Sequence, residues 1–333
     1  MRVVRAHSYG GPEVLQVDDL PLPPPGPGQV LAKVEAAGVN FFDTQLRSGL
    51  YKLGPLPVAL GNEGAGTVEA VGAGVESINV NDRVAWILAA GSYATHVVVP
   101  AQFVAPLPKQ VSFADAAATI FQGITAHYLA RSAYALRAGD TCLVHSAAGG
   151  VGILLCQMAK YLGARVIGAV SSAAKSETAR DAGVDDVIVY ADRAFDVAVR
   201  DLTGGAGVRV VYDAVGAETF ERSLNSLMPR GHLVVYGEAS GLIPPFDVRQ
   251  LLFRGSLSVT RTGLNHFVAT REEFLERAEA VFNWLCAGTI RQRIDQIFSL
   301  DQAAEAHRAL EQRETTGKLL LMPSISDKST KTP

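Results

Sequence analysis

The sequence has few cysteines and no long apolar run. Its 333 residues include only three cysteines, Cys142, Cys156 and Cys286, which lie far apart in the chain. This number excludes a disulfide framework and a CxxC metal pair, and it favours a reducing compartment. No apolar run approaches the ~20 residues that span a bilayer, and residues 1–5 lack the apolar core of a signal peptide. We therefore expect a cytoplasmic protein that does not insert into membranes.

An excess of positive charge is also lacking. The chain has 30 Lys and Arg against 33 Asp and Glu, which gives a net charge of -3, and the two signs are interspersed. Nucleic acid is therefore not expected as the main partner. Hydrophobic residues make up 48% and charged residues 19%, a balance typical of globular α/β proteins. The length suits two domains of ~100–200 residues each.

Two different patterns divide the chain. Residues 1–121 contain short β-type runs broken by Gly and Pro, such as residues 29–34, which indicates a mainly β domain. In residues 122–265, Val-rich strands, among them residues 141–145 and 232–236, alternate with amphipathic helices, a pattern typical of a doubly wound parallel sheet. Helical patterns follow at about residues 271–287 and 301–310, and then a strand pattern at residues 318–322 that needs a sheet to join. We expect residues 266–333 to return to the first domain, so that the second domain is an insertion.

A loop of small residues connects a strand pattern to an apolar helix pattern at residues 146–152, with the sequence SAAGGVG. Small residues permit a tight turn, and the amino terminus of a helix offers N–H groups and positive dipole charge to a pyrophosphate. A glycine cluster can also be a plain turn, but the flanking strand and helix favour a dinucleotide site. The candidate cofactor-binding residues of this loop are Ala148, Gly149, Gly150 and Val151.

The end of the next strand pattern bears on the choice of cofactor. An NAD-selective site usually has Asp or Glu there to bind the ribose hydroxyls, whereas this chain has Ser171 and Ser172, followed by Lys175. Two hydroxyls and one ammonium group suit a 2′-phosphate. The structural alternative is a helix cap followed by a solvated lysine. Because the acid is missing and the base is present, we expect NADPH as the cofactor.

Several motifs resemble one known family. They lie at residues 38–43, 47–51, 61–66, 146–152 and 258–261. Together with Ser171 and Lys175 they resemble the zinc-free quinone oxidoreductases (zeta-crystallin-like) of the medium-chain dehydrogenase/reductase superfamily, over residues 1–323. The resemblance implies a GroES-like, mainly β catalytic domain (residues 1–121 and 266–333) and a Rossmann NADPH-binding domain (residues 122–265). It also implies a homodimer, which agrees with the strand pattern at residues 257–261 that should end the sheet.

The resemblance also bears on metal binding. The zinc-dependent members of the superfamily carry Cys, His and Cys at positions where this chain has Asn40, Asn62 and Gln122. Neutral amides are poor zinc ligands, so we expect no metal. The histidines His96, His127 and His145 lie in strand or helix patterns and are interpreted as packing residues.

The resemblance assigns roles to further residues. Asn40 and Tyr51 would line the pocket near the nicotinamide, where an amide and a phenol stabilise negative charge on a carbonyl oxygen. Their structural alternatives are a turn residue and a packed tyrosine. Cofactor contacts are assigned to Asn40, Thr125, Tyr190, Gly237, Ser240 and Arg313. Arg313 has the charged neighbours Arg308 and Lys318, and each of the three could be an ordinary solvated charge.

Without a Lewis acid, the substrate must accept hydride readily. Quinones and enones do so, because the incoming charge delocalises onto oxygen, and simple alcohols do not. We therefore expect an NADPH-dependent quinone oxidoreductase, with the proton supplied by water or by Tyr51. The alternatives are an NADPH-dependent alkenal or enone reductase that acts on a carbon–carbon double bond, and an NADPH-binding structural or RNA-binding protein of the crystallin kind.

Overall fold

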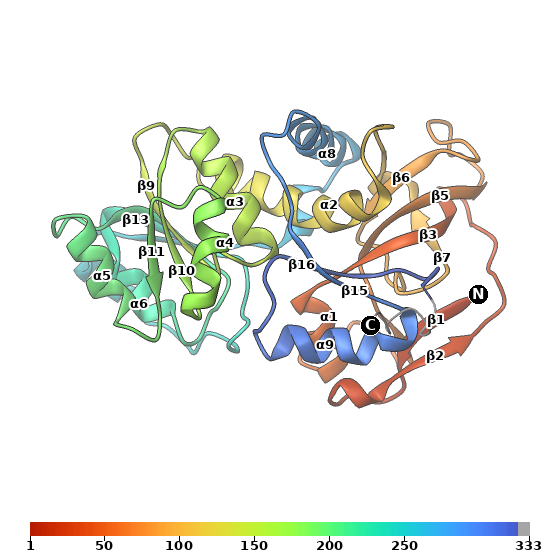
Figure 1. Ribbon diagram of the computed structural model, residues 1–333, viewed down its shortest axis with the longest axis horizontal. Coiled ribbons are helices and arrows are strands. Elements are labelled where there is room, and N and C mark those ends of the chain that lie inside the picture. The colour runs from red at the N-terminus through yellow and green to blue at the C-terminus, as the bar shows by residue number, and fades with distance from the viewer. Residues whose placement is uncertain (326–333) are drawn as a thin grey trace, which may run out of the picture. The chain divides into compact units, whose positions relative to one another are not determined.

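The computed structural model describes residues 1–325, and the chain folds into two compact units (Figure 1). Unit 1 consists of Met1–Phe121, Val268–Cys286 and the segment that begins at Gln292, and unit 2 consists of Gln122–Phe267 and Ala287–Arg291. The sequence placed the domain boundaries after residues 121 and 265. Residues 326–333, which the sequence assigned to the first domain, lie outside the described residues.

Unit 1 is built mainly from antiparallel β structure, with one parallel strand pair, Ile294–Phe298 beside Lys318–Leu321. Its larger sheet has the strand order β15-β16-β3-β5-β6-β8, with β7 also paired to β3, and its smaller sheet has the order β2-β1-β4. The strands are β1 (Arg2–Ala6), β2 (Leu15–Asp19), β3 (Gln29–Val39), β4 (Val58–Ala59), β5 (Glu63–Val71), β6 (Arg83–Ile87), β7 (His96–Pro100), β8 (Val104–Pro106), β15 (Ile294–Phe298) and β16 (Lys318–Leu321). Strand β16 pairs antiparallel with β3, from Leu319 opposite Val39 to Leu321 opposite Ala37. The expectation that the closing strand joins the first domain is confirmed.

Four α-helices contribute to unit 1 within the described residues. They are α1 (Phe41–Ser48), α8 (Arg271–Cys286) and α9 (Ala303–Glu311), together with α2 (Phe113–Tyr128), which crosses from unit 1 into unit 2. The sequence predicted one helix from about residue 301, whereas the structure has a 3-10 turn at Leu300–Gln302 before α9. The core of the unit surrounds the fully buried Trp86 and Tyr93.

Unit 2 contains a parallel sheet with the strand order β11-β10-β9-β12-β13-β14 (Figure 1). Its strands are β9 (Thr141–His145), β10 (Arg165–Val170), β11 (Asp186–Val189), β12 (Val208–Asp213), β13 (Leu227–Val235) and β14 (Ser258–Arg261), and its helices are α3 (Gly150–Tyr161), α4 (Ser176–Asp181), α5 (Phe195–Leu202), α6 (Phe220–Asn225) and α7 (Arg249–Phe253). Because the first strand lies in the middle and the order reverses beside it, this is the doubly wound dinucleotide-binding topology. The predicted α/β fold is confirmed.

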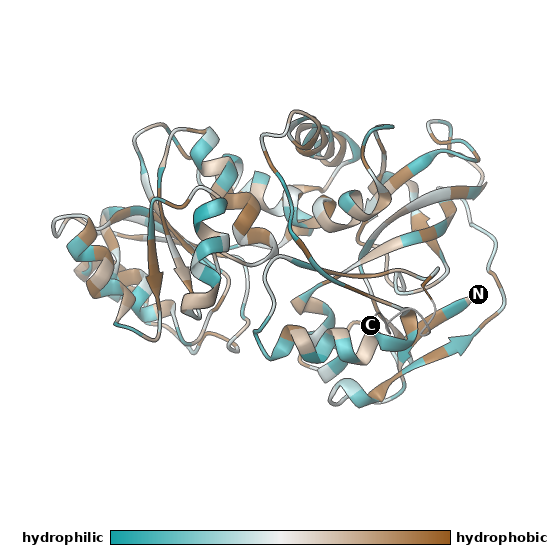
Figure 2. Ribbon diagram, in the orientation of Figure 1, coloured by the Kyte–Doolittle hydropathy of each residue, from teal (hydrophilic) through white to brown (hydrophobic). Residues whose placement is uncertain are grey.

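Hydropathy follows this architecture. Figure 2 shows hydrophobic residues along the strands of unit 2 and alternating hydrophilic and hydrophobic residues on its helices. Strand β9 is buried from Cys142 to His145, and β10 is buried from Val166 to Val170. Strands covered on both faces are nearly continuous apolar runs, which is why their positions could be predicted. Within residues 1–325, no helix is both long and apolar enough to traverse a bilayer.

Candidate functional site

The loop between β9 and α3 has the geometry that a pyrophosphate requires. Ser146 adopts the left-handed region at φ 53°, and its carbonyl oxygen accepts a hydrogen bond of 2.8 Å from the Gly149 amide. Gly149 is extended at the amino terminus of α3. A Cβ atom on Gly152 would lie 2.1 Å from the Ser146 oxygen, so only glycine fits there. The loop therefore presents the amino terminus of α3 at the carboxyl edge of the sheet, where phosphate groups bind.

The predicted phosphate-binding side chains lie one strand away. Strand β10 ends at Val170, and the next residues, Ser171 and Ser172, are exposed. The Ser172 oxygen accepts a hydrogen bond of 3.1 Å from the amide of Lys175, whose side chain is half-buried. Tyr190 follows β11, and its amide donates to the Val170 oxygen at 3.0 Å. The structure thus brings the Tyr190 backbone beside the end of β10.

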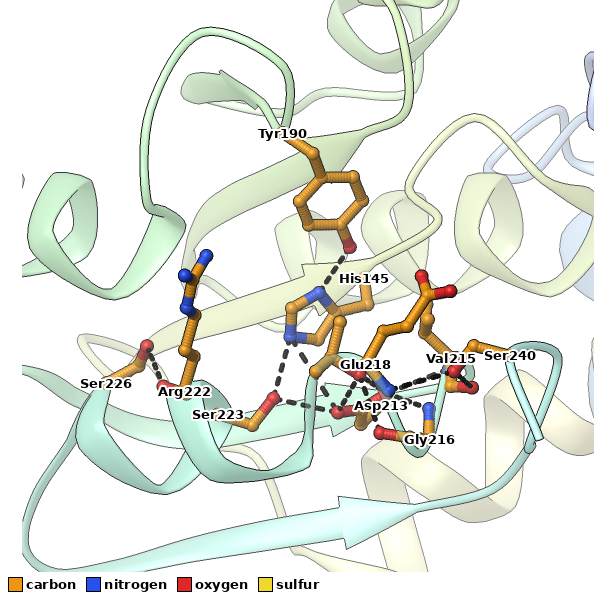
Figure 3. A network of polar contacts seen from close by, with 11 residues as sticks. His145, Tyr190, Asp213, Val215, Gly216, Glu218, Arg222, Ser223, Ser226 and Ser240 are labelled. Carbon is orange, nitrogen blue, oxygen red and sulfur yellow. Dashed lines mark hydrogen bonds and ion pairs between the residues drawn. The ribbon is translucent and has the colours of Figure 1, made fainter. Parts of the chain in front are cut away.

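Tyr190 belongs to a polar network that the sequence did not indicate (Figure 3). Its hydroxyl lies 2.5 Å from Nδ1 of His145, and Nε2 of His145 lies 3.0 Å from Oγ of Ser223. Ser223 donates to Oδ2 of Asp213 at 2.7 Å, and the Thr219 hydroxyl also donates to this carboxylate. His145 is buried, as its strand pattern predicted, but its role extends beyond packing. Burial lowers the pKa of His145, and the nearby Asp213 acts in the opposite direction.

Gly237 and Ser240, which follow β13, contact the turn that follows β12. The Ser240 hydroxyl donates to the Val215 oxygen at 2.7 Å and accepts from the Glu218 amide at 3.0 Å. A Cβ atom on Gly237 would lie 2.7 Å from the Ala214 oxygen. These two residues therefore fix the shape of this turn, which is a structural role in addition to the cofactor contact that the resemblance assigned to them.

In unit 1, Asn40 lies in a buried cluster with Glu63 and Lys318, which we call the Lys318 cluster. The Asn40 amide nitrogen donates to Oε1 of Glu63 at 2.8 Å. The Lys318 ammonium donates to the same Glu63 oxygen at 2.7 Å and to Oδ1 of Asn40 at 2.8 Å. The interpretation of Lys318 as a solvated charge is wrong, since its side chain is 2% exposed and that of Glu63 is 0% exposed. Burial lowers the pKa of Lys318, against the attraction of Glu63.

A second buried carboxylate adjoins this cluster. Asp43 accepts hydrogen bonds from the Asn62 amide nitrogen at 2.8 Å, the Tyr93 hydroxyl at 2.9 Å and the Asn40 backbone amide at 2.9 Å. Burial raises the pKa of Asp43 to about 6, although these hydrogen bonds and the charge of Lys318 act in the opposite direction. Two of the three amides at the expected zinc-ligand positions, those of Asn40 and Asn62, thus donate hydrogen bonds to carboxylates.

The residues at these positions do not fit a zinc ion. Asn40 and Asn62 are neutral amides, and the Lys318 ammonium already supplies the positive charge beside Glu63. A second cation would be repelled there. Gln122, at the third position, is buried in α2. Nowhere in residues 1–325 do three His, Cys, Asp or Glu side chains gather closely enough to hold a metal.

The remaining predicted residues have different surroundings. Tyr51 is half-buried beyond the end of α1, where its ring centroid lies 5.7 Å from that of Phe42 at the margin of the unit 1 core. Thr125 is buried within α2. Arg313 is exposed after α9 and belongs to unit 1, whereas Lys175 belongs to unit 2.

Two family models match the chain. Residues 26–109 match the alcohol dehydrogenase GroES-like domain, and residues 150–281 match the domain described as zinc-binding dehydrogenase. Together with the doubly wound sheet and its glycine loop, they define a medium-chain dehydrogenase/reductase. The chain belongs to the quinone oxidoreductase family within this class. The zinc in the second description has no counterpart in the ligand positions of this chain.

The similarity to individual relatives extends over nearly the whole chain. A quinone oxidoreductase of Pseudomonas aeruginosa is 44% identical, covering 95% of this chain and 98% of that protein. The structure of Escherichia coli quinone oxidoreductase complexed with NADPH has a TM-score of 0.95 and 40% identity, covering 97% and 100% of the two chains. A 2-haloacrylate reductase of Burkholderia sp is 39% identical, covering 95% and 97%.

Proposed function

We propose that this protein is an NADPH-dependent quinone oxidoreductase that transfers hydride to a quinone without a metal ion. The observation that carries the proposal is the end of β10, where Ser171, Ser172 and Lys175 follow with no carboxylate among residues 171–175. Similar proteins are named quinone oxidoreductases, and one of them is complexed with NADPH. When bound, NADPH would supply the hydride.

We assign cofactor binding to residues 122–265 and substrate binding to residues 1–121 and 266–333. The phosphate loop suits the pyrophosphate because of its helix terminus, and the two serines and Lys175 suit the 2′-phosphate because they offer hydroxyl donors and a positive charge. The proposed cofactor contacts are Asn40, Thr125, Ala148, Gly149, Gly150, Val151, Ser171, Ser172, Lys175, Tyr190, Gly237, Ser240 and Arg313.

Asn40 and Tyr51 are proposed to stabilise the substrate oxygen as negative charge develops on it. Lys318 and Glu63 orient the Asn40 amide, since its oxygen accepts from the ammonium and its nitrogen donates to the carboxylate. Tyr51 offers a phenol donor. A quinone that has accepted hydride is a hydroquinone anion, which water can protonate. Neither side chain is therefore required as an indispensable acid.

Reduction of an activated carbon–carbon double bond is a second candidate activity. It is favoured by the 39% identity to a protein named 2-haloacrylate reductase. An activated alkene resembles a quinone chemically, because hydride addition again places charge that an adjacent carbonyl group stabilises. A turnover screen over quinones, enones and simple alcohols distinguishes the two activities. Absence of turnover with all of them would support an NADPH-binding structural role instead.

The cofactor assignment is tested with one substitution. Lys175→Ala should weaken NADPH binding by ~1–3 kcal/mol and leave NADH binding nearly unchanged, because one charge-assisted contact to the 2′-phosphate is lost. Lys109→Ala, which removes an exposed lysine of unit 1, is the matched control and should change neither. Dissociation constants for both cofactors measure the effect. Equal use of NADH and NADPH by the parent protein would contradict the assignment.

We also propose a homodimer. Strand β14 ends the sheet of unit 2 within the described residues, which leaves an edge for pairing. Large apolar side chains lie exposed shortly before it, with Val248 at 69%, Leu252 at 65% and Phe253 at 82%. Sedimentation should report a dimer at micromolar concentration, and Leu252→Ser with Phe253→Ser should shift it toward monomer. A stable monomer of the parent protein would refute the proposal.

The cytoplasm is the proposed location. NADPH-dependent reduction belongs to a reducing compartment, and the thiols of Cys142, Cys156 and Cys286 are free. Fractionation of cells that express the chain at its natural level would test this proposal, and recovery in an oxidising compartment would contradict it.

A further inference from the structure

The hydrogen bonds around His145 determine which ring nitrogen carries a proton. The Ser223 hydroxyl has one hydrogen, and it is donated to Oδ2 of Asp213. Ser223 must therefore accept in its contact with Nε2 of His145, so Nε2 carries a hydrogen. In a neutral ring Nδ1 is then an acceptor, and the hydrogen in its contact with Tyr190 comes from the phenol. The protons therefore point in one direction, from Tyr190 through His145 and Ser223 to Asp213, along the contacts that Figure 3 marks with dashed lines.

This order restricts what Tyr190 offers to a ligand. While its hydrogen is directed to His145, the phenol oxygen can only accept hydrogen bonds from other groups. An acceptor suits a ribose hydroxyl, which is a donor, but it does not suit a phosphate oxygen, which is itself an acceptor. The Tyr190 amide donates to the oxygen of Val170, the residue directly before the first serine of the proposed phosphate site. Its hydrogen must therefore turn outward before it can bind a 2′-phosphate.

Turning the hydrogen outward affects the buried ring. Nδ1 would lose its donor, and an unpaired buried acceptor is unfavourable. Uptake of a proton from solvent at Nδ1 removes this penalty, because Nδ1–H then donates to the Tyr190 oxygen while Nε2–H still donates to Ser223. In this step the ring gains one proton from solvent, and no covalent bond of the ligand forms or breaks. Asp213, whose Oδ2 lies 4.0 Å from Nε2, stabilises the resulting imidazolium.

We propose that His145 is a protonation-dependent specificity element, which makes Tyr190 a donor to the 2′-phosphate when it is protonated and an acceptor when it is neutral. This inference rests on the proposed NADPH site. It predicts that the preference for a 2′-phosphate over a 2′-hydroxyl increases as the pH falls. His145 acts through Tyr190 and is a positioning residue.

The surroundings of the ring allow this role. His145 contacts Tyr190 after β11, Phe195 of α5 at 4.8 Å between ring centroids, Ser223 of α6 and Asp213 of β12. Among these neighbours of the ring, the titratable groups are Tyr190 and Asp213. Burial lowers the pKa of His145 and so favours the neutral ring, whereas the charge of Asp213 favours the protonated ring.

The test compares two adenosine ligands that differ only at the 2′ position, adenosine 2′,5′-bisphosphate and adenosine 5′-monophosphate. Their dissociation constants are measured from about pH 8.5 to about pH 5.5 for the parent protein and for Tyr190→Phe. The ligand phosphate itself titrates near ~6, which weakens its binding in acid. The phenylalanine variant shares this effect and corrects for it. For each protein we take the ratio of its affinity for the bisphosphate to its affinity for the monophosphate. Divided by the same ratio for Tyr190→Phe, the ratio of the parent should rise roughly tenfold toward low pH, which is the size of one charge-assisted hydrogen bond.

A second variant separates positioning from mere stability. His145→Gln replaces the ring by a side chain that does not titrate, so no proton can be taken up beside Tyr190 as the pH falls. We expect the pH dependence of the ratio to disappear in this variant. A purely structural role for His145 would weaken both ligands and leave the pH profile unchanged, which would overturn the proposal.

The unmodified protein provides a direct measurement. The ¹⁵N spectrum of His145 should show Nδ1 unprotonated in the free protein, protonated with the bisphosphate and unprotonated with the monophosphate. If Nδ1 stays unprotonated with both ligands although the bisphosphate binds more tightly, the inference fails and the proposed NADPH site stands. If the two ligands bind equally at all pH values, the proposed NADPH site fails instead.

Discussion

Removal of the Lys318 ammonium should destabilise unit 1 strongly. At 2.7 Å, and with an effective dielectric constant of ~20, the attraction between Lys318 and Glu63 is about 6 kcal/mol. Desolvation offsets it, at several kcal/mol for each ion, so the intact pair contributes little net stability. Lys318→Met leaves Glu63 uncompensated, with its side chain 0% exposed. We therefore expect the free energy of unfolding to fall by ~3–5 kcal/mol.

Urea unfolding measures this change. Tryptophan fluorescence reports on unit 1, because both tryptophans of the chain, Trp86 and Trp284, lie in that unit, so the result does not depend on unit 2 unfolding at the same time. The double variant Lys318→Met with Glu63→Gln should recover most of the loss, because no buried charge remains. Lys109→Met is the exposed control and should have no effect beyond ~0.5 kcal/mol. A Lys318→Met variant as stable as the parent would show that Glu63 does not depend on the ammonium for its burial.

Two further predictions concern the reaction. Tyr51→Phe should reduce the rate of single-turnover hydride transfer to a quinone roughly tenfold, equivalent to ~1.4 kcal/mol, and should change NADPH affinity little. The effect is smaller than the ~2.7–4 kcal/mol that one donor contributes in a dry oxyanion site, because solvent also stabilises the product anion. An unchanged rate would leave Tyr51 with its packing role beside Phe42, and complete loss would make it the essential proton donor. Elemental analysis of active protein should find no stoichiometric zinc, and a chelator should not change turnover; activity that is lost to the chelator and restored by zinc would contradict the amide interpretation of Asn40 and Asn62.

The elements that could be predicted from sequence are those with a strong local pattern. Strand β9 begins and ends at the predicted residues, and the closing strand joins the first unit as expected. The phosphate loop was found for the same reason, because small residues, a strand and a helix occur consecutively. Strand β13 begins earlier than predicted, at Leu227 rather than His232, since its first part contains exposed residues such as Arg230 that obscure the apolar pattern.

The polar contacts inside the units could not be predicted in this way. Lys318 is separated from Glu63 by 255 residues, and nothing in its local sequence distinguishes a buried lysine from a solvated one. Its position in the apolar run of residues 318–322 was a weak signal. Likewise His145 and Ser223 come from different elements, 78 residues apart, and only the parallel sheet brings them together. Local patterns place the backbone, whereas the charge and hydrogen bonding of these residues depend on the assembled fold.

The last prediction concerns Asp43 and the pH dependence of stability. The pKa of this buried carboxyl is raised from 3.8 to about 6, mainly because burial disfavours its charged form. Between these two values the native state binds more protons than the unfolded state, so stability is lost as the pH rises through this window. The difference corresponds to ~3 kcal/mol, at 1.36 kcal/mol for each pKa unit.

Asp43→Asn removes the titration and retains an acceptor oxygen for the Tyr93 hydroxyl or the Asn40 backbone amide. Asn62 can rotate its amide and present its oxygen to the new nitrogen. Urea unfolding from about pH 4 to about pH 7, followed by tryptophan fluorescence, should therefore show the parent losing ~3 kcal/mol relative to the variant as the pH rises. The variant cancels the contributions of all other titrating groups, because it shares them. Parallel stability curves for the two proteins would mean that the hydrogen bonds from Tyr93, Asn62 and Asn40 fully compensate for burial, and that Asp43 carries its charge without cost.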